Sequence, residues 1–184
     1  MSQIKQLGDF YGKEVRHWWE IALKRYSQHD VIEYAGTSDL QRWRCRGSQT
    51  LAYGFDVIQS DKTLIICGDI GDLIIGRYRG TLDWLYGSYT DLNYVAEKCE
   101  AGEIREYSQQ VAEENWRMWL EDVEVERDED DDDGCGFENE HEYYDVMFGL
   151  GDDEPSSPLE YTCEFIHCVA AGVWLANKVL GEST

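Results

Sequence analysis

Four short runs of strand-forming residues follow one another closely in the first half of the chain, and turns of a few residues separate them. Parallel strands need a crossover of a dozen or more residues between them, whereas antiparallel strands are joined by tight turns. The spacing therefore predicts an antiparallel meander over roughly residues 40–78. Its strands are expected in residues 39–48, 50–59, 62–67 and 73–79.

The turn Gly-Asp-Ile-Gly-Asp at residues 68–72 joins the last two of these strands. A phosphate-binding loop leads from a strand into a helix N-terminus, but here a second strand follows, and two aspartates would repel a phosphate. Two carboxylates without further oxygen ligands also make a poor calcium or magnesium site. We therefore expect a structural hairpin in which Gly68 or Gly71 adopts a positive φ.

Amphipathic spacing predicts helices on both sides of the meander. In residues 9–28, apolar side chains recur every three or four positions, which predicts a helix with a wide aromatic face. Thr90 or Asp91 is expected to cap a second helix, and Ser157 to cap the final and most buried one. The later helices are expected in residues 90–102, 105–125, 141–151 and 157–181.

These patterns together predict an α+β fold, and a chain of 184 residues is long enough to bury one sizeable core. We expect a single domain over residues 1–184, in which helices pack against the four-stranded meander. Its expected parts, in chain order, are a helix at 9–28, the sheet at 40–78, helices in 90–126, an acidic loop at 127–140 and C-terminal helices in 141–181.

The cellular compartment is predicted from what the sequence lacks. There is no run of about 18 apolar residues and no basic segment followed by an apolar one at the N-terminus, so we expect neither a membrane span nor a signal peptide. The six cysteines show no Cys-x-x-Cys spacing and are expected to be mostly free thiols. A cytoplasmic location is the expectation.

Charge is distributed very unevenly along the chain. The formal net charge is −22, and residues 121–184 contain twenty acidic and two basic residues. Such a field repels nucleic acids and anionic membranes and attracts basic protein surfaces. We therefore expect no direct binding to nucleic acid and no membrane binding. The expected partner is a basic protein or nucleoprotein complex.

Several segments resemble a family of hypothetical proteins encoded by tailed bacteriophages and prophages. Members of that family share a Phe-Asp strand, a Gly-Asp-(Ile/Met)-Gly hairpin and a C-terminal helix with aromatic, Cys, Ala and Trp residues. The resemblance implies a phage origin, an α+β fold and a site of action in the infected host cell, and it supplies no catalytic residues. The similar segments are RWRCRGS, YGFDVI, LIICGDIGDLIIGR, DLNYVAEK, REYS and YTCEFIHCVAAGVWLANK.

The acidic segment is the first candidate site. A dense anionic surface can occupy a basic channel built for phosphates, through the same release of counterions that drives nucleic-acid binding. With the phage resemblance, this predicts an inhibitor of a host nucleic-acid-handling or defence complex of the CRISPR or restriction type, acting as a nucleic-acid mimic. The alternative is a loop that only improves solubility. The expected contact residues are Glu126, Asp128, Glu129, Asp130, Asp131, Asp132 and Asp133.

The same segment contains a partial calcium-binding pattern. Glu129, Asp131, Asp133, Gly134 and Glu140 fall at positions 1, 3, 5, 6 and 12 of an EF-hand-like loop. Glutamate replaces the usual aspartate at the first position, and acidic repeats produce such patterns by chance. We expect no bound cofactor beyond weak calcium binding here.

Arg42, Arg44 and Arg46 share one face of the first expected strand. One interpretation is that they pair with the protein's own carboxylates, and the other is that they bind a nucleotide. The protein would then be a module that sequesters a nucleotide immune signal or a metal ion. This ligand-binding function is the alternative to inhibition by mimicry.

One set of residues is a candidate both for zinc binding and for nucleophilic catalysis. Cys163 and His167 stand one helical turn apart, and Cys135 and His141 could complete a zinc site. The same spacing also describes an ordinary apolar helix face, and packing is the favoured interpretation. A catalytic Cys–His pair needs an orienting third group, which the sequence does not indicate. We expect the protein not to be an enzyme.

Overall fold

A computed structural model describes residues 7, 11–37, 39–48, 52–76, 81–86, 91–122, 136–149 and 155–181. Its contacts divide the chain into two compact units. Unit 1 comprises Met1–Ile104 and Thr162–Thr184, and unit 2 comprises Arg105–Tyr161. A single domain over residues 1–184 stays a prediction, and each unit is described by itself.

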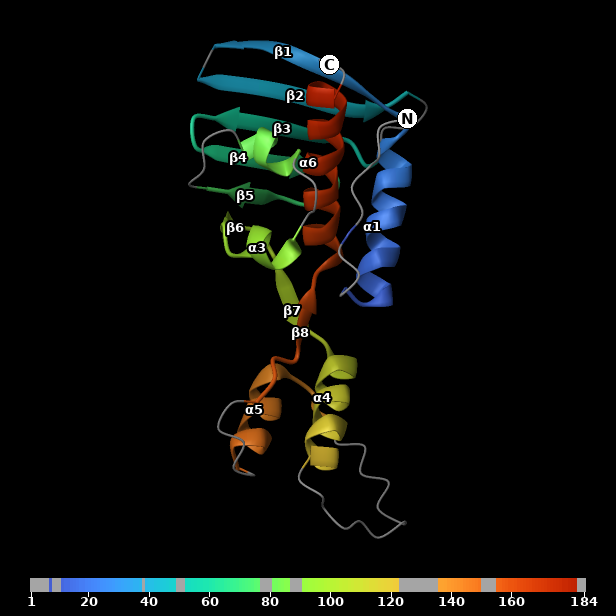
Figure 1. Cartoon of the computed structure of the whole chain (residues 1–184), viewed down its shortest axis with the longest axis vertical. Helices are drawn as coiled ribbons and strands as arrows, with labels where there is room; N and C mark the ends of the chain where they lie inside the picture. The colour runs from blue at the N-terminus through green and yellow to red at the C-terminus, as the bar shows by residue number, and fades with distance from the viewer. Residues whose placement is uncertain are drawn as a thin grey trace. The chain divides into compact units, whose positions relative to one another are not determined.

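The structure has the α+β composition that the sequence predicts (Figure 1). The helices are α1 (Lys13–Tyr26), α2 (Thr81–Leu85), α3 (Leu92–Ala96), α4 (Gln109–Asp122), α5 (Glu140–Gly149) and α6 (Cys163–Gly181). The strands are β1 (His29–Thr37), β2 (Leu40–Gly47), β3 (Phe55–Ser60), β4 (Thr63–Gly68), β5 (Leu73–Ile75), β6 (Cys99–Ala101), β7 (Arg105–Tyr107) and β8 (Leu159–Tyr161).

Unit 1 is built on a six-stranded sheet in the order β1-β2-β3-β4-β5-β6, and every neighbouring pair is antiparallel. The predicted meander is confirmed, but it has six strands instead of four. The two additional strands, β1 and β6, lie at the edges of the sheet. Edge strands bury less of their surface, so their apolar patterns are weaker and the sequence signal for them is poor.

The predicted helix over residues 90–102 is wrong in its second half. Asp91 caps α3 as expected, because its Oδ1 accepts hydrogen bonds from Asn93 N at 3.0 Å and from Tyr94 N at 3.2 Å. The helix ends after five residues, at Ala96. The chain then turns and pairs with β5 as strand β6, so sheet pairing overrides the local helical signal.

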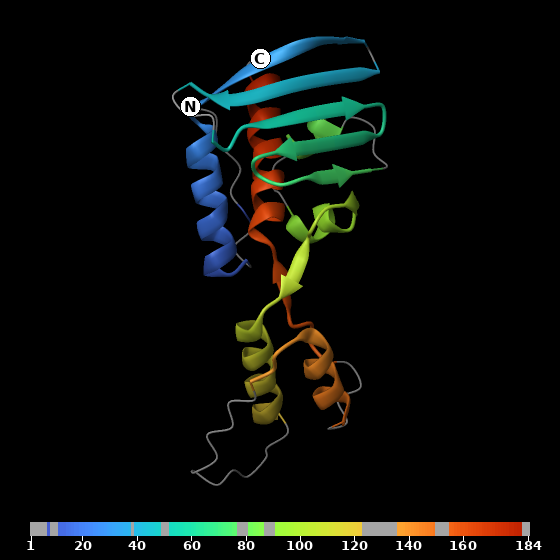
Figure 2. The same ribbon diagram turned by 180° about the vertical axis from the view of Figure 1, so that it is seen from behind.

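One face of the sheet is covered by helices, and the core of unit 1 lies there (Figures 1 and 2). The inward side chains of β2 to β5 are almost completely buried, among them Trp43, Phe55 and Ile66. Helix α6 packs closely on this layer at Gly172, where an added Cβ would lie 3.1 Å from Cδ1 of Ile66 on β4.

Helix α6 is the most buried helix, as the sequence predicts, and every residue from Phe165 to Ala176 is buried. Its predicted start is wrong. Residues 159–161 form β8, and Thr162 caps the helix by accepting a hydrogen bond from Phe165 N at 3.0 Å. By length and composition alone α6 could cross a membrane, and 67% of its apolar window is buried inside the protein.

The hairpin at residues 68–72 is a structural bend. Gly68 and Gly71 both adopt positive φ angles, 142° and 104°. Asp69 Oδ2 accepts a hydrogen bond from Gly54 N at 3.2 Å, and Asp69 N donates to Gly54 O at 2.9 Å. The Asp69 carboxylate therefore ties the bend to the residue that precedes β3.

Unit 2 consists of the β7-β8 ribbon, α4, α5 and a small aromatic core. The buried residues of this core are Ala112, Phe137, Tyr143 and Met147. Helix α4 begins at residue 109 instead of 105, because Ser108 Oγ accepts a hydrogen bond from Val111 N at 3.3 Å and residues 105–107 form β7. Helix α5 agrees with the predicted helix at residues 141–151.

Candidate interaction surfaces

The acidity of the chain is concentrated in unit 2. Unit 2 contains twenty-one acidic and three basic residues, a net charge of −18. Unit 1 contains seventeen acidic and thirteen basic residues, a net charge of −4. The charge asymmetry seen along the sequence therefore coincides with a division between two folded units.

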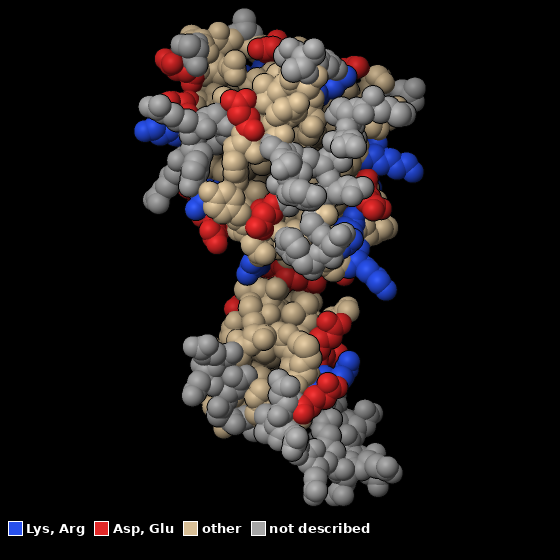
Figure 3. Space-filling model, viewed as in Figure 1, with Lys and Arg blue, Asp and Glu red and all other residues tan. Residues whose placement is uncertain are grey.

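Carboxylates of α4 and α5 point into solvent. Glu114 and Glu121 on α4 and Glu142 and Asp145 on α5 are all exposed. Among the described residues of unit 2, Arg105 and Arg117 are the basic ones. Figure 3 shows both signs of charge on unit 1, and on unit 2 acidic side chains with a basic one among them.

The predicted partner-binding residues lie outside the described part of the chain. They are Glu126, Asp128, Glu129, Asp130, Asp131, Asp132 and Asp133. Of the calcium pattern, only Glu140 is described, and it is the first residue of α5. The described residues contain no group of three or more His, Cys, Asp or Glu side chains that could hold a metal ion.

Of the residues considered for zinc or nucleophilic chemistry, His167 is buried and Cys163 half-buried on α6, and the His141 side chain on α5 is exposed. Cys135 lies outside the described residues. His167 Nδ1 lies 3.3 Å from the Tyr26 hydroxyl, and the His167 ring contacts Trp18 edge-on. Burial, with a smaller contribution from Arg25, lowers the pKa of His167. Burial raises the pKa of Cys45 and of Cys99 to about 12, so neither thiol forms a thiolate readily at neutral pH.

The three arginines of β2 converge on a single carboxylate, that of Asp56 on β3 (the arginine cluster). Arg42 binds Asp56 Oδ2 through Nε at 3.1 Å and through Nη2. Arg44 donates from Nε to Oδ1 at 3.1 Å and from Nη2 to Oδ2 at 3.3 Å. Arg46 Nη2 lies 3.2 Å from Oδ1. As one interpretation of the sequence holds, the arginines pair with a carboxylate of the protein itself.

This cluster combines a buried anion with half-exposed cations. The Asp56 side chain is 10% exposed, whereas the three arginine side chains are 35–43% exposed. Burial by itself raises the pKa of Asp56, but hydrogen bonds from Arg44 and Arg42 outweigh it, and the pKa is lowered overall. Asp56 is therefore ionised and holds the three guanidinium groups in place.

The arginine cluster lies on the face of the sheet opposite the core. Cross-strand pairing aligns Tyr34, Arg42, Ile58, Ile65 and Ile74 in one row over β1 to β5. Seen from behind, this face shows strands in front of α6, with no helix of the described residues across it (Figure 2). Antiparallel sheets commonly expose such a face to water, but it then usually carries polar side chains.

Exposed apolar side chains gather at the β1-β2 end of this face. Ile32 is 51% exposed, Leu40 49% and Tyr34 41%. The Tyr34 ring lies 5.3 Å from the Arg42 guanidinium carbon and 5.4 Å from that of Arg44, within the range of cation–π contacts. Sequence reasoning identified the arginines but not Tyr34 and Asp56, because only strand pairing brings these residues beside them.

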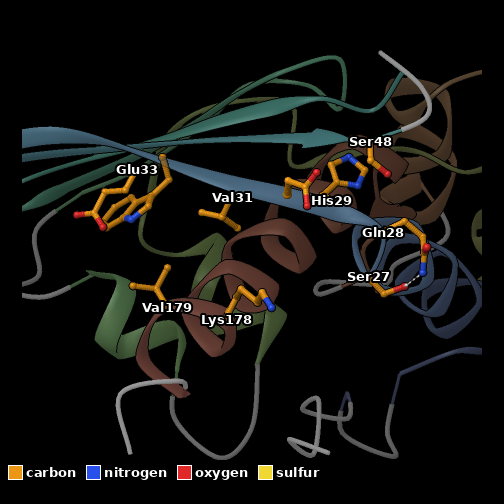
Figure 4. A pocket seen from close by; sticks show the side chains of 10 residues that line it. Ser27, Gln28, His29, Val31, Glu33, Ser48, Lys178 and Val179 are labelled. Carbon is orange, nitrogen blue, oxygen red and sulfur yellow. Dashed lines mark hydrogen bonds between the residues drawn. The ribbon is translucent and has the colours of Figure 1, made fainter.

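A pocket of about 700 Å³ lies between β1 and the end of α6 (Figure 4). Val31 and Glu33 stand on the β1 side, and Lys178 and Val179 on the α6 side. Trp43 also lines the pocket, and its buried Nε1 has no hydrogen-bond partner among the described residues. No sequence pattern predicts this pocket, since β1 itself was not predicted.

His29 lines the pocket and is nearly buried. Its Nδ1 lies 3.2 Å from Arg25 O, and its Nε2 lies 3.0 Å from Tyr53 O. These contacts fix the ring between the end of α1 and the segment before β3. His29 thus acts as a structural link at the start of β1.

Comparisons of the chain with protein-family models, with curated proteins and with solved structures found no match. The resemblance to phage proteins, the cytoplasmic location and the absence of enzymatic activity therefore stay predictions.

Proposed function

We propose that the protein is an inhibitor that binds a basic, nucleic-acid-binding surface of a host nucleic-acid-handling or defence complex, with unit 2 acting as the nucleic-acid mimic. The observation that carries this proposal is the net charge of −18 on unit 2, against −4 on the remainder of the chain. The resemblance to phage proteins favours a bacterial host complex as the target.

The physical basis is competition for the same positive surface. A nucleic acid binds such a surface largely by releasing condensed counterions, so affinity falls steeply with salt. A dense array of carboxylates can form ion pairs with the same lysines and arginines. Unit 2 can therefore exclude nucleic acid without reading any sequence.

The folded core of unit 2 supports this proposal over a loop that only improves solubility. Phe137 is 1% exposed, and its ring contacts both Trp116 and Tyr143 edge-on. This packing fixes the carboxylates of α4 and α5 on one scaffold. Fixed charges lose less conformational entropy on binding than charges on a flexible chain.

The test is affinity capture from bacterial lysate with the full-length protein at low and high salt. The variant with Asp130→Asn, Asp131→Asn, Asp132→Asn and Asp133→Asn removes four charges from unit 2. The matched control removes four charges from exposed positions of unit 1 through Glu14→Gln, Glu20→Gln, Asp61→Asn and Glu97→Gln.

We expect a nucleic-acid-binding complex to be captured by the wild type and by the control at low salt, and to be lost with the Asn variant and at high salt. The purified complex should also release its nucleic acid when the wild type is added. Capture that is indifferent to salt and to the Asn substitutions would overturn the mimicry proposal.

A further inference from the structure

The arginine cluster belongs to the sheet of unit 1 and shares no residue with the acidic unit 2. We propose that Arg42 and Arg44, together with Tyr34, bind a small organic phosphate, with the phosphate on the two guanidinium groups and its apolar or aromatic part against Tyr34. The site takes part in no step of the inhibition described above, so the two proposals stand or fall separately.

The arginine cluster carries an excess of positive charge. Three guanidinium groups share one carboxylate, which leaves two positive charges uncompensated within the cluster. In the strand register Asp30 stands opposite Arg46 on the same face, so part of this excess is balanced at that end. The excess positive charge is therefore concentrated at Arg42 and Arg44.

Arg42 and Arg44 each keep hydrogen-bond donors that Asp56 does not use. Both Arg42 and Arg44 use Nε and Nη2 to bind Asp56. The Nη1 group of each has no acceptor among the described residues, and each Nη1 carries two N–H bonds. Guanidinium groups bind phosphate oxygens through such paired donors. Two neighbouring Nη1 groups thus remain available for an anion.

The guanidinium groups of Arg42 and Arg44 are preorganised for binding. Arginine side chains on a surface normally lose conformational entropy when they bind a ligand, because several rotatable bonds become fixed. Here the buried Asp56 carboxylate and the Tyr34 ring already hold Arg42 and Arg44 side by side. A ligand therefore meets guanidinium groups that are already ordered, which increases the affinity gained from each hydrogen bond.

The surroundings indicate an organic phosphate in preference to a nucleic-acid strand. Ile58 and Ile65 continue the row next to Arg42. Tyr34 and Ile32 are the exposed apolar groups beside the arginines. A polynucleotide needs basic groups along its whole path, whereas one phosphate with one apolar moiety matches two arginines next to one ring.

The experiment is isothermal titration calorimetry of the full-length protein with inorganic pyrophosphate and, separately, with ATP at low ionic strength. We expect saturable binding of one molecule per chain for both probes. Arg42→Gln should lower the affinity for both probes at least tenfold. The matched control is Lys62→Gln, which removes one charge from the exposed β3-β4 turn of the same sheet and should change neither.

A second variant keeps the proposal testable if Arg42→Gln disturbs the fold. Tyr34→Ser removes an exposed ring that makes no hydrogen bond to Asp56. We expect this substitution to weaken the binding of ATP more than the binding of pyrophosphate. Equal weakening of the two probes would restrict the site to the phosphate alone and overturn the role of Tyr34. The absence of saturable binding to either probe, or an equal loss with Lys62→Gln, would overturn the site.

Discussion

The hydroxyl of Tyr26 on α1 lies 3.3 Å from Nδ1 of His167 on α6, inside the core of unit 1. Tyr26 is fully buried and His167 is 5% exposed, so this is a polar contact within an otherwise apolar interface between two helices. Buried polar groups of this kind fix the register of the surfaces that carry them.

Removing the Tyr26 hydroxyl should destabilise unit 1 modestly. We expect Tyr26→Phe to lower the free energy of unfolding by about 1 kcal/mol, because the buried contacts of the hydroxyl with Nδ1 and the backbone O of His167 are lost while the ring is retained. Urea denaturation followed by tryptophan fluorescence measures the change. Tyr86→Phe, at a tyrosine that is 40% exposed, is the control and should have no effect. An equal effect of both substitutions would contradict this role for the hydroxyl.

Stability should fall as the pH drops below the ordinary pKa of histidine. Burial lowers the pKa of His167 in the folded state, so below about pH 6.5 the unfolded state binds a proton that the folded state does not. The free energy of unfolding should therefore decrease between pH 7 and the lowered pKa of His167. We expect His167→Gln to flatten this part of the curve, and His17→Gln, at an exposed histidine, to leave it unchanged. Identical pH profiles for the wild type and His167→Gln would refute the assignment.

Asp56 should stabilise the sheet only while it is ionised. Its pKa is lowered in the folded protein, so its contribution is present above the unfolded value of about 3.9 and is lost as the pH falls through the lowered value. At pH 7 we expect Asp56→Asn to cost roughly 1–2 kcal/mol, since the arginines are partly screened by solvent. Asp61→Asn, at an exposed position of the β3-β4 turn, is the control. Thermal unfolding at pH 7 measures the stability of the two variants. An equal loss of stability in Asp56→Asn and Asp61→Asn would show that only net charge matters.

Gly68 should tolerate no side chain. Its φ is 142°, and an added Cβ would lie 2.5 Å from Gly54 O and 2.9 Å from Phe55 Cα. We expect Gly68→Ala to destabilise the protein by more than about 1 kcal/mol. Gly136→Ala adds the same atom at an exposed loop position where nothing lies within 4 Å, and it should change stability by less than about 0.5 kcal/mol. Comparable losses for the two variants, measured by chemical denaturation, would show that the bend is not the cause.

Unit 2 should be able to lose its structure while unit 1 keeps its own. Phe137→Ala removes the ring at the centre of the small aromatic core, and such truncations cost roughly 3–5 kcal/mol. In hydrogen–deuterium exchange we expect amides of α4 and α5 to lose protection while those of α6 keep it. The exposed Phe148, 56% accessible, gives the control variant Phe148→Ala. Simultaneous loss of protection in α6 would show that the two units unfold together.

The outer face of the sheet shows where sequence reasoning reached its limit. Alternation along β2 correctly placed Arg42, Arg44 and Arg46 on one face, because side chains in a strand point to opposite sides with a period of two. Their common partner, Asp56, lies on the next strand, and the register that pairs Arg44 with it is a property of the folded sheet. Local sequence contains no information about that register.

Sequence by itself determined the α+β class, the antiparallel meander, the bend at Gly68 and Gly71, the buried final helix and the location of the excess negative charge. Each of these follows from local periodicity, glycine conformation or composition. Tertiary structure alone decided that β1 and β6 extend the sheet, that residues 99–101 leave a helical pattern to pair with β5, and that three arginines share Asp56. The physical reason is that strand pairing and burial depend on partners distant in the chain, and their free energy outweighs the small local propensities on which sequence prediction relies.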